Sequence, residues 1–376
     1  MNHRDTTEPD DELLAALALS LAPGVGPKLQ AQLLAEFGSP QNVLAQSPAV
    51  LLGVDGIGPK TSAGLADPMV KVTARAMLAE CRASGVDLMS LAHPEYPRRL
   101  KEICDPPAVL YRRGVLLPQD ELSIAVVGSR RCTTYGRRHA ERLATALSRA
   151  GFTIVSGLAR GIDIAAHHGA LQAGGRTLAI LASGVRDIYP PEHADVAEEI
   201  TQQGALLSEM PLDQRPFPGL FPQRNRIISG MCLGVIVIEA TRNSGALYTA
   251  RHALEQGREV FALPGSVDSL ASAGCHDLIR DGVTLVRHVD DVLQALGPLP
   301  VPASTTSSVT IHSPRELALN SLESAVLNHI SSVPVHIDEI LRQATQETSR
   351  VLATLTVLEM RRLVRRLPGN LLVRYD

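Results

Sequence analysis

Short apolar runs alternate with helical patterns over residues 123–286, and this alternation constrains the fold more than any other sequence feature. The runs are rich in Val, Ile and other strand-forming residues. We predict strands at residues 123–127, 152–156, 177–181, 205–209, 234–239, 259–263 and 283–286. We predict helices at residues 136–150, 161–173, 193–203, 224–231 and 245–256. This pattern indicates an α/β fold, in which helices cover both faces of a Rossmann-like, doubly wound parallel sheet.

The N-terminal region contains one short motif twice, as G-V-G-P-K at residues 24–28 and G-I-G-P-K at residues 56–60. Each copy follows an apolar helical pattern and precedes another helix, which predicts a helix-hairpin-helix domain over residues 11–84, after a disordered tail over residues 1–10. The glycine turns can present backbone N–H groups to phosphates, with Lys28 and Lys60 beside them. The sequence allows two functions for this domain: a secondary DNA-binding site at these lysines, or contact with another protein.

Proline and Ser/Thr residues dominate residues 298–316, and this composition is typical of a linker. The core with its leading connector is therefore assigned to residues 85–297. Three helical patterns and a Pro-Gly-Asn turn follow, which predicts a small winged-helix-like domain over residues 317–376. Such domains bind nucleic acid or protein, so duplex DNA is one candidate partner for the terminal domains.

Composition narrows the compartment and the cofactors. The five cysteines are separated and form no C-x-x-C pair, which favours a reducing compartment and gives no support to a zinc site. The apolar run at residues 13–22 is too short to span a bilayer. The net charge of −3 means that any nucleic-acid contact must come from a local patch. We expect a soluble, cytoplasmic protein that binds no metal, cofactor or membrane.

The turn after the first core strand tests for a dinucleotide cofactor. It reads G-S-R-R, with one glycine where a dinucleotide fold needs G-x-G-x-x-G. Arginine side chains at this turn would crowd a pyrophosphate, so NAD and FAD are excluded. Gly128, Ser129 and Arg130 offer instead a close backbone approach, a hydroxyl and a guanidinium for phosphate oxygens.

The end of the second core strand repeats this pattern. Ser156 and Gly157 follow the strand, and Arg160 comes shortly after. Arg160 is a candidate phosphate ligand, but an internal ion pair with Asp163 is an equally simple explanation for its presence.

Two further clusters lie where a strand meets a helix. The first contains Phe221, beside which a base could stack, and the donors Gln223, Arg224, Asn225 and Arg226. The second contains Asn243, Ser244 and Gly245, which are expected to cap the next helix and point its N–H groups at an anion. Together the clusters predict a groove for a chain of phosphates.

The sequence offers no convincing catalytic set. Glu239 is the best-placed acid, but no base or nucleophile accompanies it at motif spacing, and no G-x-x-x-x-G-K-[ST] motif is present. We therefore expect a protein that is not an enzyme. A nucleotide-processing hydrolase on a related scaffold remains the alternative, because such sites assemble from dispersed residues.

Several motifs together resemble the DNA-processing protein A family (DprA, also called Smf). They are G-S-R at Gly128, S-G-L-A-R-G-I-D at Ser156, F-P-Q-R-N-R-I-I-S-G at Phe221, S-G-A-L-Y-T-A at Ser244 and G-R-E-V-F-A-L-P-G at Gly257. The resemblance is strongest in the Rossmann-like core. It implies that residues 11–84 form a SAM-like or helix-hairpin-helix domain and that the C-terminal segment is the winged-helix domain of the family.

The resemblance implies a recombination mediator that binds and protects single-stranded DNA. Such proteins load the RecA recombinase onto the strand during natural transformation, with repair as a further context, and form homodimers through the core. By this resemblance, the DNA pocket would use Arg130, the basic cluster that begins at Gln223 and the Ser244–Gly245 loop. The alternative family of phosphoribohydrolases carries a catalytic Glu in the loop that corresponds to residues 243–251, and this sequence lacks it.

Overall fold

The computed structural model describes residues 10–299, 302–304 and 310–375. The chain divides into two compact units, one ending at Leu285 and the other beginning at Val286. The first unit contains the helical domain and the sheet, and the second contains the winged-helix domain. Residues 1–9 of the predicted tail lie outside the described residues, and the first helix begins at Asp10.

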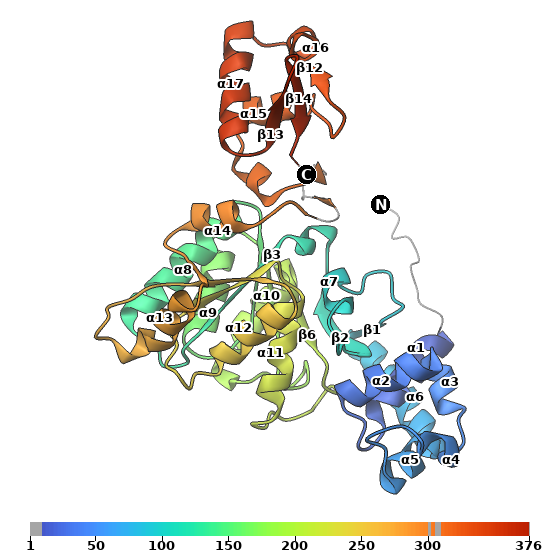
Figure 1. Ribbon diagram of the computed structural model, residues 1–376. Coiled ribbons are helices and arrows are strands. Elements are labelled where there is room, and N and C mark those ends of the chain that lie inside the picture. Colours follow the sequence, from blue (N-terminus) through green and yellow to red (C-terminus); the bar gives the residue numbers. More distant parts are fainter. Residues whose placement is uncertain (1–9, 300–301, 305–309, 376) are drawn as a thin grey trace. The chain divides into compact units, whose positions relative to one another are not determined.

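A nine-stranded sheet forms the centre of the first unit, in the order β1-β2-β6-β5-β4-β3-β7-β8-β9. Figure 1 labels β1, β2, β3 and β6 of this sheet. The seven strands from β3 to β9 run parallel, whereas β1 and β2 are antiparallel additions at one edge. Their bounds are Asp87–Ser90, Val109–Gly114, Ser123–Gly128, Thr153–Ser156, Thr177–Ile180, Ala205–Ser208, Gly234–Ile238, Glu259–Ala262 and Thr284–Leu285. The predicted doubly wound sheet is confirmed.

Helices cover both faces of this sheet because successive strand residues point to opposite sides. On β5, Leu178 and Ile180 pack in the cluster that contains residues of α11 and α12, whereas Ala179 packs in the cluster that contains residues of α9 and α10. Helix α8 packs against α9. The helices of the core are α8 (Thr134–Arg149), α9 (Ile162–Gln172), α10 (Ala194–Gln203), α11 (Leu220–Gly230), α12 (Ala246–Glu255) and α13 (Ala273–Arg280).

The strand order reverses between β3 and β7. The chain moves outward from β3 to β6 and then returns to place β7 on the other side of β3. In open α/β sheets, ligands bind outside the carboxyl ends of the strands at such a reversal. Gly128 at the end of β3 pairs with Ile238 at the end of β7, so these residues mark the edge where a site is expected.

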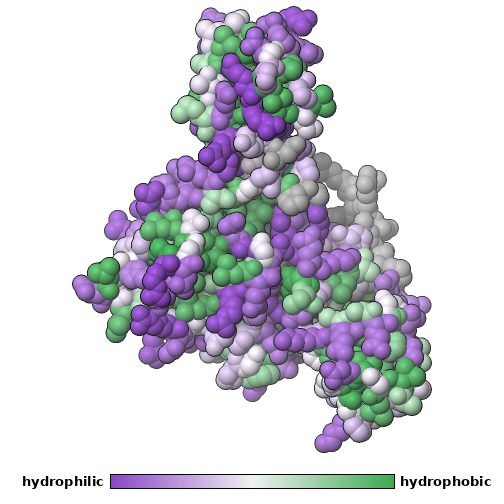
Figure 2. Space-filling model, viewed as in Figure 1, coloured by the Kyte–Doolittle hydropathy of each residue, from purple (hydrophilic) through white to green (hydrophobic). Residues whose placement is uncertain are grey.

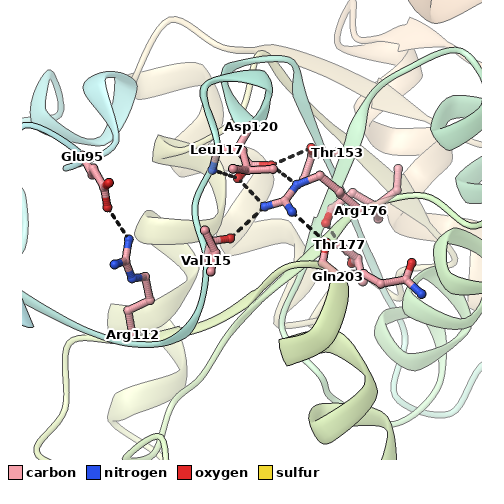
Figure 3. A network of polar contacts seen from close by, with 10 residues as sticks. Glu95, Arg112, Val115, Leu117, Asp120, Thr153, Arg176, Thr177 and Gln203 are labelled. Atoms are coloured by element: carbon pink, nitrogen blue, oxygen red, sulfur yellow. Dashed lines mark hydrogen bonds and ion pairs between the residues drawn. The ribbon is translucent and has the colours of Figure 1, made fainter. Parts of the chain in front are cut away.

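A polar network stabilises the sheet at the opposite end of the parallel strands, near their amino ends (Figure 3). Arg176 donates two hydrogen bonds to Asp120, at 2.8 and 2.9 Å, and Thr153 donates a third at 2.8 Å. Arg176 also donates to the carbonyl oxygens of Val115 and Gln203. The carboxylate is buried and its lone pairs are satisfied, so the network anchors this edge of the sheet.

The N-terminal helical domain is confirmed. It contains α1 (Asp10–Leu21), α2 (Pro27–Phe37), α3 (Pro40–Leu44), α4 (Pro48–Leu51), α5 (Pro59–Ala66) and α6 (Pro68–Ala83). Two motif turns precede α2 and α5 with nearly the same backbone: φ is 80° at Gly24 and 83° at Gly56. Only glycine adopts this region readily, which explains why both copies have glycine there.

The second unit is a winged helix, as predicted. Helices α15 (Ser321–Leu327), α16 (Ile337–Gln343) and α17 (Thr348–Met360) pack beside a three-stranded sheet in the order β12-β14-β13, with bounds Val335–His336, Leu371–Arg374 and Val364–Leu367. The unit also includes α14 (Val289–Ala295), a pairing of β10 (Ala303–Ser304) with β11 (Thr310–Ile311), and a short 3-10 helix at Pro314–Ala318. Part of the predicted linker, residues 300–301 and 305–309, lies outside the described residues.

Among the described residues, no helix combines the length and apolar character needed to cross a membrane. On the face shown in Figure 2, hydrophilic and hydrophobic residues are interspersed over the surface.

Candidate nucleic-acid interface

An open groove of about 850 Å³ lies at the carboxyl ends of β3 and β7, where the strand order reverses. We call it the switch-point groove. Its walls come from the turn after β3, the segment that leads into α11, α11 itself and the start of α12. The predicted site residues that line it are Gly128, Ser129, Arg130, Phe221, Arg224, Asn225, Ser244 and Gly245.

The turn after β3 forms one wall. A Cβ at Gly128 would overlap the carbonyl oxygen of Ile238 on β7, so the close pairing of these strands requires glycine. Ser129 accepts a hydrogen bond from the backbone N–H of Arg131 at 3.1 Å, which closes the turn. The exposed side chain of Arg130 is left pointing over Phe221, with its guanidinium carbon 4.4 Å from the ring centroid.

Aromatic side chains accompany this arginine. The rings of Phe221 and Tyr189 meet edge to face, with centroids 6.0 Å apart. Phe217 and Tyr248 also line the groove, and each is 51% exposed. Exposed aromatic faces beside a cation suit the stacking of unpaired bases.

Arg224 lies in the floor rather than on the surface. It is only 5% exposed, and its Nη1 donates to the carbonyl oxygen of Ile180 at 2.7 Å. Burial lowers the pKa of Arg224 to about 10, and the nearby Asp163 opposes that shift. Arg224 therefore remains charged at neutral pH, but it serves the fold as well as the groove.

Asp163 and Gly157 complete the floor. Asp163 accepts the backbone N–H of Gly157 at 3.2 Å, and burial raises the pKa of this carboxyl. A Cβ at Gly157 would overlap the guanidinium of Arg224, so glycine is needed to seat that arginine. Gly157 lines a smaller hollow that shares Arg130 and Phe221 with the groove.

Two predictions for this region need correction. The hydroxyl of Ser156 is fully buried and donates to the carbonyl oxygen of Val126 at 2.6 Å, so it faces the sheet and not a ligand. Arg160 does not pair with Asp163; it pairs with Glu192 at 2.5 Å, on the surface. Arg160 lines the smaller hollow, and its exposed side chain stays within reach of a ligand there.

The start of α12 forms the other wall. Ser244 Oγ accepts the backbone N–H of Ala246 at 3.4 Å, and Asn225 donates to the carbonyl oxygen of Gly245 at 3.2 Å. The first three N–H groups of this helix already have acceptors in Ser244 or Gly245, so the helix end offers an anion its partial positive charge and not free N–H groups. Asn243 is exposed but does not line the groove.

The basic cluster after Phe221 is not a turn, because α11 begins at Leu220 and includes it. The helical periodicity separates its side chains: Arg224 and Asn225 line the groove, whereas Gln223 and Arg226 line a second hollow with Lys28. Arg226 is 4% exposed and pairs with Glu209 at 2.7 Å and with Asp105 at 3.2 Å, so the predicted direct role in the groove is wrong for this residue. Lys60 is exposed and lines neither hollow.

Glu239 is held by structural contacts. Its carboxylate accepts the backbone N–H of Thr133 at 2.7 Å and the hydroxyl of the same residue. It therefore supports the amino end of α8 and does not line the groove. Within the described part of the chain, no cluster of three or more His, Cys, Asp or Glu side chains could hold a metal ion.

Among the groove residues that sequence reasoning missed are Tyr189, Thr241 and Thr249. Thr241 comes three residues after the end of β7 at Ile238, which was a usable signal for a position at the carboxyl ends of the strands. Tyr189 lies in the long connection after β5, far in sequence from every motif that we used, and only the fold brings it to Phe221.

The comparisons with known proteins agree with this architecture. Residues 87–297 match the family described as DNA recombination-mediator protein A, and residues 312–370 match the DprA winged helix domain. The Protein Smf of Synechocystis is 38% identical over 289 residues, which cover 76% of this chain and 73% of that protein.

Two solved structures are also similar. DNA processing protein A from Streptococcus pneumoniae has a TM-score of 0.63 and 33% identity, covering 77% of this chain and 99% of that one. The same protein from Helicobacter pylori, whose structure concerns its single-stranded DNA binding mode, has a TM-score of 0.50 and 31% identity, covering 55% and 93%. The chain belongs to the DNA recombination-mediator protein A family.

Proposed function

We propose that this protein is a recombination mediator that binds single-stranded DNA in the switch-point groove. The observation that carries the proposal is the guanidinium of Arg130 placed 4.4 Å over the ring of Phe221, beside the amino end of α12. This combination offers a cation, an aromatic face and the partial positive charge of a helix end in one groove. A strand with exposed bases and phosphates can use all three at once.

The groove favours a single strand over other anions. Its 850 Å³ volume and its open form exceed what one small anion needs. Stacking on Phe221 or Tyr189 requires bases that are not already stacked in a duplex. Family membership supports the proposal, as does the single-stranded DNA binding of the Helicobacter pylori relative.

We infer no catalytic step. Glu239 is occupied by Thr133, and the loop at residues 243–251 has no glutamate that could serve as in the phosphoribohydrolases. From the family we further infer that the bound strand is protected and passed to RecA in the cytoplasm during natural transformation, and that the chain acts as a homodimer through its core.

Fluorescence anisotropy with labelled oligonucleotides tests the proposed binding. We expect tighter binding of single strands than of duplexes of equal length, with an affinity that falls steeply with salt because phosphate contacts release counterions. Arg130→Ala should weaken single-strand binding without lowering the melting temperature, because Arg130 is exposed. Equal affinity for duplex and single strand, or no effect of Arg130→Ala, would remove the groove as the principal site.

A further inference from the structure

We propose that a second hollow, between the first glycine turn and α11, is a phosphate subsite that continues the single-strand track out of the switch-point groove. We call it the hairpin hollow. It is lined from one side by Gly24, Gly26, Pro27 and Lys28, and from the other by Pro222, Gln223 and Arg226. The inference rests on the proposed function, because it extends the path of the same strand.

The hairpin hollow adjoins the groove. Pro222 lines both, so one residue forms the ridge between them. The next residue, Gln223, is exposed and lines the hollow alone. The volume of about 630 Å³ is within the range of small-ligand sites, about 300–1,000 Å³. A strand that leaves the groove over Pro222 therefore enters the hairpin hollow directly.

The first turn is shaped for close approach of a phosphate. Gly26 is extended, with φ −87° and ψ 173°, and Pro27 is the first residue of the eleven-residue helix α2. Proline has no N–H and the N–H of Gln30 donates to the carbonyl oxygen of Gly26, so the free donors of this helix start are those of Lys28 and Leu29. No atom lies within 4 Å of a Cβ placed on Gly26, so this face of the turn is open. The exposed ammonium of Lys28 adds a full positive charge.

Arg226 supplies an independent sign of a missing partner. Only 4% of the residue is exposed, and it lines the hairpin hollow. Nε pairs with Asp105 and Nη2 with Glu209, but Nη1 is buried with no hydrogen-bond partner. A buried guanidinium N–H without an acceptor is unfavourable. If the guanidinium turns toward the hollow, an anion bound there supplies that acceptor.

The charges around the hollow are mixed. Arg226 sets one positive charge against the two carboxylates of Asp105 and Glu209, so this group keeps a net charge of −1. Asp55 and His252 also line the hollow, and Asp55 is the acidic group there with no ion pair among the described contacts. Lys28 offsets Asp55, and the amides of α2 add partial positive charge.

The second turn provides a control within the same chain. Gly56 has φ 83° and Gly58 has φ −94° and ψ 173°, which repeats the first turn, and Lys60 repeats Lys28. The two turns pack together, since a Cβ at Gly24 would lie 2.7 Å from Oγ1 of Thr61. Lys60, however, does not line the hairpin hollow. The two lysines thus share a motif and differ in whether they face the proposed track.

The test compares Lys28→Gln with Lys60→Gln in the full chain, using oligothymidylates of about 5 and about 15 nucleotides. Lys28→Gln should weaken binding of the long oligonucleotide by roughly threefold. It should also lower the slope of log affinity against log salt concentration by about 0.7, which corresponds to the loss of one phosphate contact. The same substitution should leave the affinity for the short oligonucleotide unchanged, because that strand fits within the switch-point groove. Lys60→Gln should change neither, and both variants should melt like the wild type, because both lysines are exposed.

Three results would overturn the inference. If Lys28→Gln binds the long strand as tightly as the wild type does, the hairpin hollow is not a phosphate subsite. If both lysine variants lose affinity equally, and lose more for a duplex than for a single strand, then the two glycine turns together bind duplex DNA. Equal loss on short and long strands places Lys28 at the groove itself. Failure of the wild type to bind even the short strand is a different result, because it overturns the proposed function first.

Discussion

The guanidinium of Arg130 lies 4.4 Å from the centroid of the Phe221 ring and joins the turn after β3 to the first turn of α11. The two residues are far apart in sequence, and each comes from an element that ends or begins at the carboxyl edge of the sheet. An arginine on an aromatic face keeps its N–H groups free at the edges of the guanidinium plane, where phosphate oxygens can reach them.

Phe221→Ala should therefore weaken single-strand binding by about 1–3 kcal/mol, the contribution of one stacked base, as measured by anisotropy. Phe221→Tyr should retain most of the affinity, because it keeps the aromatic face for both Arg130 and a base. If the Tyr variant loses as much affinity as the Ala variant, the ring acts through the packing of the loop and not through stacking.

Arg224→Ala should destabilise the fold. Its side chain is 5% exposed and donates to Ile180 on β5 while facing Asp163. Its removal leaves the buried carbonyl oxygen of Ile180 without this donor, a loss of about 1–3 kcal/mol, and also takes a nearby positive charge away from the buried Asp163. Thermal or urea denaturation measures the change. A loss of DNA affinity with unaltered stability would show that Arg224 acts as a ligand alone.

Gly157→Ala and Gly245→Ala form a matched pair. A Cβ at Gly157 would overlap the guanidinium of Arg224, which cannot move easily in its buried seat, so this variant should melt well below the wild type. A Cβ at Gly245 meets nothing within 4 Å, and the residue has φ −58° and ψ −25°, which alanine adopts readily. Gly245→Ala should keep or slightly raise the melting temperature. Similar melting of the two variants would contradict this account of the groove floor.

Acid should destabilise the core partly through His167. Its ring is fully buried, its Nδ1 lies 2.7 Å from Oγ1 of Thr177, and burial lowers its pKa from 6.5 to about 3. Below pH 6.5 the unfolded chain binds a proton that the folded chain does not, so stability falls with pH by up to about 1.4 kcal/mol per unit until about pH 3.

The His167 prediction is measured by urea unfolding at several pH values between 4 and 7. His167→Gln should show a shallower acid limb, because glutamine does not titrate. The absolute stability of the variant is not the readout, since its side chain also packs differently. An acid limb of unchanged slope in the variant would assign the pH dependence to other groups.

Deleting the second unit after Leu285 tests where the principal site lies. The switch-point groove and the hairpin hollow are both built from residues of the first unit, so most single-strand affinity should remain. The exposed surface of α17 offers Arg350 as its one Lys or Arg, which is a weak basis for phosphate binding. A large loss of single-strand affinity in a truncated protein that still melts cooperatively would move the principal site to the winged helix.

Local patterns were enough to predict the sheet and its edge. Each strand between β3 and β9 is a short apolar run, and the seven predicted strands agree with the observed ones to within one or two residues at their ends. The glycine at position 128 was informative for the same reason, since a turn at the end of a buried strand requires close backbone approach. The carboxyl edge of the sheet then followed from the parallel topology.

Side-chain roles were harder, because they depend on partners from distant segments. The sequence placed Arg224 and Arg226 together as surface donors, but helical periodicity separates them and burial pairs Arg226 with Glu209 and Asp105. Ser156 carries the right chemistry for a phosphate, yet the orientation of its Cβ sends the hydroxyl to Val126.

The amino-acid sequence thus determined the fold class, the flanking domains and the end of the strands where open α/β sheets bind ligands, because these follow from local periodicity and from the short-range rules of turns. The tertiary structure decided which cations are free. Burying an arginine is favourable only with acceptors nearby, and for Arg226 those acceptors, Glu209 and Asp105, come from separate segments of the chain. Arg130 is left exposed over Phe221 by the packing of α11, a relationship that no local pattern contains.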